Sequence, residues 1–291
     1  LTGANLTKAT LRKADLSQAH VTPRFLNLFP TNFSWADLSE AKLIGANLAG
    51  VDFTGAVLTQ ADLTRANLLN ADLEDADLSA AILIETSLIE ADLDHADLTD
   101  ANLSRANLTD ACLDRTNLSR ANLSNTFLSK ATFRKANLNQ VNLQKSRLNN
   151  ADLSGIDLRG ADLSEANLTR ADLRGTGLEG AQLQGANLYE ADLTGADLSR
   201  ADLEGVNLIR ARLRIADLRW SKLSGAELDG AKLVGANLTG ANLARASLNR
   251  SDLSRANLTN ADLSGADLNR ADLSRTALSQ AILVGTDLYR A

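Results

Sequence analysis

Apolar residues recur along this chain with a period of five. From Phe33 to Leu288 every fifth residue is leucine or phenylalanine, which gives 52 consecutive repeats. We number this central residue i. Position i−2 is usually alanine, position i−1 is mostly Asp or Asn, and positions i+1 and i+2 carry polar residues, charges or glycine. In an α-helix, five residues advance by about 140° net, so the leucines would spiral around every side. The pattern therefore excludes an amphipathic helix.

The repeat instead predicts a short β-segment followed by a turn. Positions i−2, i−1 and i alternate as inward, outward and inward, and two residues remain to reverse the chain. Seventeen of the 18 glycines occupy i+2. Glycine recurs where a tight turn needs a positive φ, as at the third residue of a type II turn. Where i+2 is Arg, Asn or Glu, we expect a different turn type.

The repeats closely match a known consensus. The segments Ala61-Asp62-Leu63-Thr64-Arg65 and Ala261-Asp262-Leu263-Ser264-Gly265 follow the motif A(D/N)LXX almost word for word. The chain resembles the pentapeptide-repeat family over nearly its whole length, and its repeat sequences are similar to those of the many cyanobacterial members. The resemblance implies an all-β fold, a right-handed quadrilateral β-helix. This solenoid would have four pentapeptides per 20-residue coil, with i and i−2 inward, and about 13 coils from Phe33 to Leu288.

One interruption divides the repeats. Residues 1–21 form N-terminal pentapeptide repeats in a shifted register, residues 22–32 interrupt them, and residues 33–291 are predicted to be a continuous β-helix. Both prolines lie in the interruption, and proline cannot donate to a ladder, so we expect a loop or a corner. This loop is either a tolerated insertion or a contact loop.

The contact-loop hypothesis rests on aromatic residues, which are few in this chain. Phe25, Phe29 and the nearby Trp35 are its candidate contacts. Both ends of the sequence fall inside a repeat and there is no methionine, so the chain is interpreted as a stretch of something longer. Uncapped ends could also associate end to end, because unpaired ladder edges invite pairing.

No residues form a plausible catalytic or metal-binding set. His20 and His95 would lie about four coils apart, too far to share a metal ion or a proton. Cys112 stands at the outward position i−1 with no histidine within reach, so an inert thiol is favoured. Columns of Asp at i−1 could attract cations, but the family uses Asp or Asn there for turn and ladder hydrogen bonds. A leucine-filled interior leaves no concave site. We therefore predict no enzyme activity, no cofactor and no metal.

Charge is distributed in blocks. Residues 33–114 have a net charge of −13, residues 115–150 carry seven basic and no acidic residues, residues 151–208 sum to −7, and residues 209–291 to +4. The total of −6 argues against direct nucleic-acid binding. Apolar runs are too short to cross a bilayer, so we expect no membrane insertion and favour a soluble, cytoplasmic protein. Some family members resist fluoroquinolones by imitating DNA to gyrase, and the acidic block matches duplex charge density locally but not over the whole chain.

The outward positions supply the candidate interaction surface. It comprises the apolar residues Leu69, Ile89, Tyr189, Ile209, Ile215 and Trp220, and the arginine ladder Arg250, Arg270 and Arg290. The leading hypothesis is a non-enzymatic rigid scaffold that binds a partner protein along flat charged faces. One alternative is a DNA-mimic-like inhibitor or protector of a DNA-handling enzyme such as gyrase. Another is the repeat arm of a larger multidomain protein.

Overall fold

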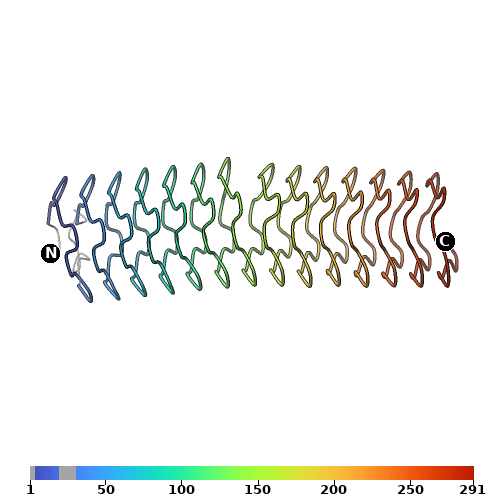
Figure 1. The fold of residues 1–291 in the computed structure, drawn as a ribbon, viewed down its shortest axis with the longest axis horizontal. Helices are drawn as coiled ribbons and strands as arrows, with labels where there is room; N and C mark the ends of the chain where they lie inside the picture. Colours follow the sequence, from blue (N-terminus) through green and yellow to red (C-terminus); the bar gives the residue numbers. More distant parts are fainter. Residues whose placement is uncertain (1–3, 20–30) are drawn as a thin grey trace. The chain divides into compact units, whose positions relative to one another are not determined.

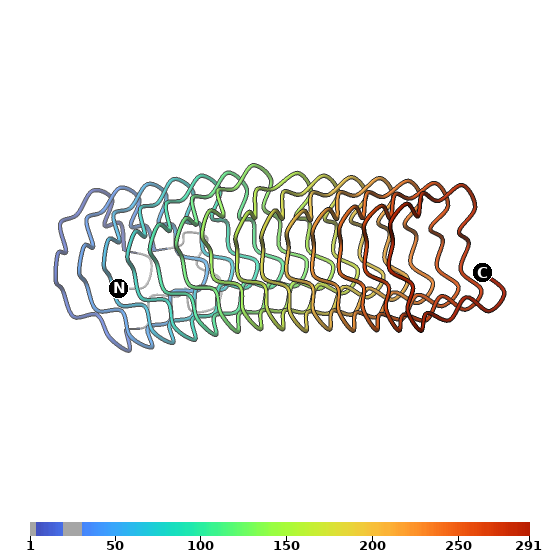
Figure 2. The same cartoon turned by 45° about the vertical axis from the view of Figure 1, so that its right-hand side comes forward.

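The backbone winds into successive coils within each of two compact units. The computed structural model describes residues 4–19 and 31–291. Unit 1 comprises Leu1–Arg147 and unit 2 comprises Leu148–Ala291. In each unit the coils follow one another in sequence order (Figures 1 and 2). The described residues contain no helix, hence none that could cross a membrane, and no strand longer than an isolated bridge residue.

Each pentapeptide contributes one β-bridge and one turn. The bridge residue is at i−1 and the turn covers i+1 and i+2. Bridges are parallel and join residues 20 positions apart, as in Asp52↔Asp72 of unit 1 and Asp172↔Asp192 of unit 2. Twenty residues are four repeats, so successive turns divide each coil into four faces. A residue therefore stacks directly on its counterpart in the next coil of the same unit.

The turns share one geometry whatever residue occupies i+2. The carbonyl oxygen of i accepts the N–H of i+3, as in Ala191 N to Leu188 O at 3.0 Å. Glycines at i+2 have φ between 62° and 70°, and the other described residues there are also left-handed, for example Ile215 at 52° and Arg250 at 56°. The expectation of a second turn type is therefore wrong. Every described turn resembles type II, in which the second central residue has positive φ.

The ladder explains this uniformity. Within each unit the N–H of an i+2 residue typically donates to the carbonyl of i+1 in the next coil, as in Arg250 N to Asn269 O at 3.0 Å. Only a repeated turn conformation aligns these groups, and a buried unpaired backbone group would be costly. Hydrogen bonding between coils thus imposes the left-handed conformation on arginine and isoleucine as well as on glycine.

Apolar side chains fill the interior of both units. Between residues 31 and 271 the central residues and the small residues at i−2 are buried, with Leu208 and Val206 at 0% exposure, whereas Leu283 and Leu288 in the last coil are exposed. The rings of Phe33 and Phe53 stack at 5.2 Å between centroids. The buried hydroxyl of Thr86 donates to the Leu63 carbonyl at 2.8 Å. Each fully buried leucine contributes about 2 kcal/mol. The interior therefore needs no metal or disulfide for its stability.

The N-terminal repeats stack on the following coil at a longer interval. Asn5, Thr10 and Asp15 bridge to Asn32, Asp37 and Lys42 respectively. The interval is 27 residues instead of 20, so seven additional residues are accommodated while the bridged columns continue. Phe25, Phe29, His20 and most of the predicted interruption lie outside the described residues.

Candidate partner-binding surface

The Asp and Asn residues at i−1 mainly serve the turns. Their Oδ1 accepts the backbone N–H of i+1, as in Ser264 N to Asp262 Oδ1 at 2.9 Å and Thr194 N to Asp192 Oδ1 at 3.0 Å. Hydrogen bonds from the hydroxyl and the backbone N–H of Ser264 lower the pKa of Asp262. Among the described residues no group of three potential ligands could hold a metal ion. The carboxylate columns therefore stabilise turns.

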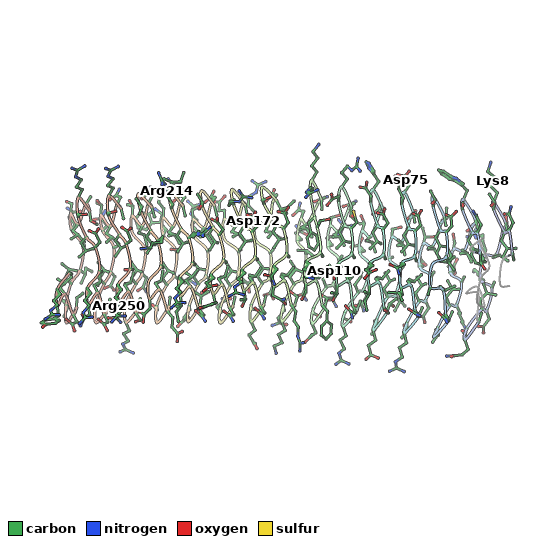
Figure 3. The ribbon with its side chains drawn as sticks, turned by 180° about the vertical axis from the view of Figure 1, so that it is seen from behind. Lys8, Asp75, Asp110, Asp172, Arg214 and Arg250 are labelled. Carbon is green, nitrogen blue, oxygen red and sulfur yellow. The ribbon has the colours of Figure 1, made fainter. Side chains whose placement is uncertain are left out.

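Charged side chains on the outside often pair between neighbouring coils. Arg65 Nε lies 2.8 Å from Glu85 Oε2, and Arg170 Nε lies 2.8 Å from Glu190 Oε2. The hydrogen bond from Arg170 is the main reason that the pKa of Glu190 is lowered. Exposed pairs of this kind contribute little to stability, because water and salt screen them. Figure 3 shows the charged side chains, including Asp172 and Arg250, on the outside of the ribbon.

The faces of unit 2 separate the predicted apolar anchors. Face A contains the repeats centred on every twentieth residue from Leu148 to Leu288. Faces B, C and D begin five, ten and fifteen residues later. Tyr189 and Ile209 are half-buried on face A, whereas Ile215 is 63% exposed on face B. Trp220 is 58% exposed on face C, which is opposite face A. Trp220 therefore does not flank Ile209, and these residues do not form one continuous patch.

Both tryptophans lie flat against glycine in the next coil. A Cβ added to Gly240 would lie 2.3 Å from Trp220 Cε3, and one added to Gly55 would lie 2.5 Å from Trp35 Cε3. Trp35 is nevertheless 55% exposed. Glycine at these two positions leaves room for the indole ring and also allows the left-handed turn. Each ring thus presents one side to its own fold and the other to solvent.

Unit 1 carries an acidic face and a separate apolar pair. Leu69 is 36% exposed and Ile89 is half-buried in the next coil of the same face. The acidic face comprises the repeats centred on Phe53, Leu73, Leu93 and Leu113. Its carboxylates are Asp52, Asp72, Glu74, Asp75, Asp92, Asp94 and Asp114. Arg115 pairs with Asp94, and Arg134 lies 3.9 Å from Asp114.

The histidine and the cysteine of the described chain also lie on the acidic face. His95 is exposed at i+2, and Cys112 is half-buried at i−1. Burial raises the pKa of the Cys112 thiol, and the charges of Asp114 and Asp92 act in the same direction. A thiol with a raised pKa holds little thiolate at neutral pH, which opposes nucleophilic chemistry.

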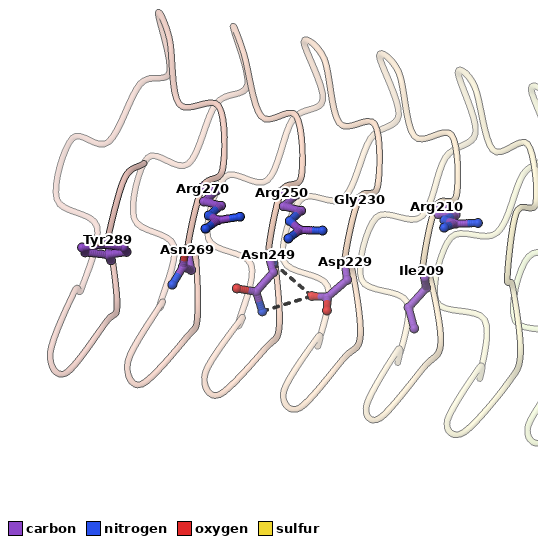
Figure 4. Close-up of a pocket in the computed structure, with 9 residues that line it drawn as sticks. All are labelled: Ile209, Arg210, Asp229, Gly230, Asn249, Arg250, Asn269, Arg270 and Tyr289. Carbon is purple, nitrogen blue, oxygen red and sulfur yellow. Dashed lines mark hydrogen bonds between the residues drawn. The ribbon is translucent and has the colours of Figure 1, made fainter.

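A groove on face A of unit 2 brings together polar, charged and aromatic side chains. Its volume is about 540 Å³, and it is lined by Ile209, Arg210, Asp229, Gly230, Asn249, Arg250, Asn269, Arg270 and Tyr289. In Figure 4 the three arginines extend along one side of the ribbon, and the i+1 residues follow the other. Gly230 interrupts the arginine column and leaves a gap between Arg210 and Arg250. Of the predicted site residues, the groove unites Ile209, Arg250 and Arg270 and excludes Ile215 and Trp220.

An exchange of hydrogen bonds holds the floor of this groove. Ser247 replaces the usual Asp or Asn at i−1, so the Asn249 backbone N–H turns instead to Asp229 Oδ1 of the preceding coil, at 3.0 Å. The Ser247 hydroxyl donates to the same oxygen at 2.5 Å. Arg134 and Asp114 make the same exchange in unit 1, at 2.9 Å. Every twentieth residue from Ile209 to Tyr289 belongs to this column, so its polar members Asp229, Asn249 and Asn269 are recognisable from spacing, although apolar residues and arginines alone do not reveal them.

Comparison with known proteins identifies the family. The model of pentapeptide repeats matches residues 1–22 and, in overlapping segments, residues 31–291. The chain belongs to the pentapeptide repeat family, and its fold is the right-handed quadrilateral β-helix predicted above. Proteins of this family are generally structural or interaction modules. No curated protein sequence matches the chain.

Several solved structures are similar to this chain. HetL, a pentapeptide repeat protein involved in heterocyst differentiation regulation from the cyanobacterium Nostoc sp. strain PCC 7120, is 29% identical over 100% of this chain and 91% of its own, with a TM-score of 0.18. Rfr23 from the cyanobacterium Cyanothece 51142 is 28% identical over 47% of this chain and 88% of its own, with a TM-score of 0.22. QnrB1, a plasmid-mediated fluoroquinolone resistance protein, is 16% identical over 70% of this chain and 87% of its own, with a TM-score of 0.31.

Proposed function

We propose that this protein is a non-enzymatic scaffold that binds a partner protein along its charged outer faces. The filled interior carries this proposal. Central and i−2 side chains occupy the inside of both units, so variable chemistry is confined to the outward positions i−1, i+1 and i+2. Enzymes normally need a concave, largely apolar site. The surfaces of this molecule instead offer repeated rows of side chains, which suit the recognition of another macromolecule.

The charge pattern gives each face a separate identity. Face A of unit 2 carries the arginine column, face B carries Arg255 and Arg275, and face C carries Trp220. Complementary charge mainly sets the specificity and rate of association, whereas buried aromatic residues more often supply affinity. We therefore expect a partner to recognise one face, not the solenoid as a whole.

Quantitative capture from an extract of the source cells tests this proposal. The immobilised full chain is compared with three variants, namely Arg250→Glu/Arg270→Glu on face A, Arg255→Glu/Arg275→Glu on face B, and Trp220→Ala on face C. We expect at least one protein whose capture falls with one variant and persists with the other two. If all four chains capture the same proteins in equal amounts, the faces have no role in binding and the proposal is wrong.

The acidic face of unit 1 supports a second candidate, a DNA-mimic-like inhibitor or protector of a DNA-handling enzyme such as gyrase. Its four coils span about 14 Å at the usual strand spacing. Duplex DNA carries about eight charges over that length, against the seven carboxylates of this face. A supercoiling assay with gyrase tests the idea, using the full chain and an Asp72→Asn/Asp75→Asn/Asp92→Asn variant. The candidate requires inhibition or protection at about micromolar chain that the variant loses.

A further inference from the structure

Unit 2 changes from paired to unpaired cations along its length. All but Arg214 of the cations from Arg159 to Lys232 lie at ion-pair distance from a carboxylate. From residue 233 onward the sequence has six arginines and five acids. Within the described chain none of these six makes an ion pair: Arg245, Arg250, Arg255, Arg270, Arg275 and Arg290. The groove of face A therefore has guanidinium groups available to an outside anion.

The gap at Gly230 makes this surface concave. Arginines stand one and two coils beyond it, at Arg250 and Arg270, and Arg210 stands one coil before it. Arg210 is already engaged, with Nη1 at 3.1 Å from the Tyr189 hydroxyl and 3.6 Å from Glu190 Oε1. The two unpaired guanidinium groups lie on neighbouring coils, about 4.8 Å apart along the column. They can engage two carboxylates, and each can do so with two parallel hydrogen bonds.

The opposite wall offers neutral amides. The Asn249 amide nitrogen donates to Asp267 Oδ2 at 2.9 Å and contacts Ser247 Oγ at 3.0 Å, which leaves its carbonyl oxygen as an acceptor. In the next coil, the backbone N–H of Asn269 donates to Asp267 Oδ1 at 3.0 Å. The Asn269 side-chain amide makes no hydrogen bond within the described part of unit 2. A side-chain amide can both donate to and accept from a peptide backbone, which presents one N–H and one C=O per residue.

The wall also contains the Asp229 carboxylate, one oxygen of which is already engaged. Asp229 Oδ1 receives the Asn249 backbone N–H and the Ser247 hydroxyl, so this oxygen is held against the fold. At the two ends of the groove lie apolar groups, the half-buried Ile209 and the exposed ring of Tyr289. From residue 209 to residue 289 the groove extends over about 19 Å, the length of about six residues in extended conformation.

We propose that this groove binds a short, extended acidic segment of the partner protein, with side-chain carboxylates on Arg250 and Arg270 and its backbone on the amides of Asn249 and Asn269. The inference deepens the proposed function and rests on it. Nucleic acid fits the surface less well, because Asp267 and Asp287 flank the groove and unit 2 as a whole has a net charge of −3, from 16 basic and 19 acidic residues. Such a surface repels a long polyanion and accepts a short segment whose charges face one side.

The test measures fluorescence anisotropy of a fluorescein-labelled hexapeptide in which Glu alternates with Ser, so that its charges face one side when it is extended. The peptide is titrated with the full chain at about 0.05 M salt. Arg250→Glu/Arg270→Glu should weaken binding by about tenfold or more. The control Arg255→Glu/Arg275→Glu has the same spacing, the same change of net charge and equally unpaired arginines on face B. It should change the dissociation constant by less than about twofold. Equal losses in the two variants would show non-specific attraction and overturn the proposal.

A second pair of variants separates shape from charge. Gly230→Arg adds a cation but fills the gap. The left-handed φ of Gly230 is 67°, and arginine occupies the same region at Arg210 and Arg250, with φ of 58° and 56°. It should weaken peptide binding although it raises positive charge, whereas Gly235→Arg on face B should not. If Gly230→Arg binds the peptide more strongly than the original chain does, the groove is not the binding site and the proposal is wrong. Unchanged circular dichroism and thermal unfolding confirm that each variant is folded.

Three further results would also overturn the inference. The first is that the peptide does not bind at up to about 1 mM chain. The second is that inorganic phosphate at matched charge competes as well as the peptide does. The third is that a fluorescein-labelled duplex DNA binds more tightly than the peptide and depends on the same arginines. If the peptide does not bind and a cellular partner is lost only with the face B or face C variant, the scaffold proposal stands and the groove proposal is wrong. If the peptide does not bind and no captured protein depends on any face, both the groove and the scaffold proposal are wrong.

Discussion

At position i+2 the backbone adopts a conformation that most residues avoid. A left-handed φ brings Cβ close to the following carbonyl and costs about 1–2 kcal/mol for a residue with a side chain. Ile215 combines this φ of 52° with a β-branched side chain that is mostly exposed. Strain of this kind persists only where the surrounding structure imposes it, here through the hydrogen bonds between coils. Ile215 therefore destabilises its own turn.

We predict that Ile215→Gly raises the free energy of unfolding by about 1 kcal/mol, because glycine removes the clash, although it adds entropy to the unfolded chain. The reciprocal change is Gly235→Ala in the next coil of the same face. It should lower stability by a similar amount, because alanine is strained at the left-handed φ of this position. The added Cβ would make only an ordinary contact, at 3.6 Å from Ile215 Cγ2, so steric overlap does not contribute. Midpoints of urea unfolding check both. A loss of stability in Ile215→Gly would show that the side chain is held by contacts that outweigh the strain.

The pentapeptide is the structural element of this fold, and most of its turns are stabilised by an Asp or Asn oxygen at i−1. In Asp262 that oxygen receives two donors from Ser264. Because the folded-state pKa is lowered, this group contributes stability that is present above the unfolded pKa of about 3.9 and lost as pH falls through the folded value. Acid should therefore weaken the turn at Asp262, whereas an Asn at the same position would not titrate.

Asp262→Asn tests this at one turn. The amide oxygen still accepts the Ser264 N–H, so stability at pH 7 should change little. Between pH 7 and pH 2 the variant should lose less stability than the original chain, because its turn no longer titrates. Chemical unfolding at the two pH values gives the comparison. Asp262→Ala serves as the control that lacks the oxygen, and it should be less stable at pH 7. An identical pH dependence in all three chains would contradict the assigned role.

The sequence predicted this element well but not completely. Alternation around each leucine predicted the burial of i and i−2, because periodicity two has only two sides. Glycine at i+2 predicted the left-handed turns, yet the residues at Ile215 and Arg250 carried no local sign of the same conformation. That conformation comes from ladders between residues 19 positions apart. The exchange between Asp229 and Asn249 was missed for the same reason, since it depends on which residue occupies the previous coil.

At the scale of the whole molecule, each coil contacts chiefly its neighbours within its unit. Bridges link residues one coil apart, so stability is a sum of coil and neighbour terms, as in other solenoids. Local damage should therefore remain local. This property distinguishes the fold from a globular domain with one shared core.

We predict that Leu203→Ala opens its own coil and the adjacent ones and leaves unit 1 unchanged. A buried Leu→Ala substitution costs about 2–5 kcal/mol through lost burial and the cavity that remains. Native-state hydrogen exchange should show faster exchange for amides of residues 183–223, with rates in residues 31–110 as in the original chain. The exposed-site variant Glu204→Ala is the control and should change neither region. Faster exchange throughout both units would show that the chain unfolds as one cooperative body.

The common left-handed turn also has a genetic consequence. Glycine codons differ from arginine codons by a single base, and 13 glycines and nine arginines occupy the 29 positions i+2 of unit 2. At the glycine and arginine corners other than Gly240, against which Trp220 packs, one point mutation can therefore exchange bare backbone for a positive charge. The backbone stays in place because the ladder already accommodates both residues. Gains and losses of charge on the outside can thus accumulate by neutral drift, and new partner specificities can arise without any intermediate that fails to fold.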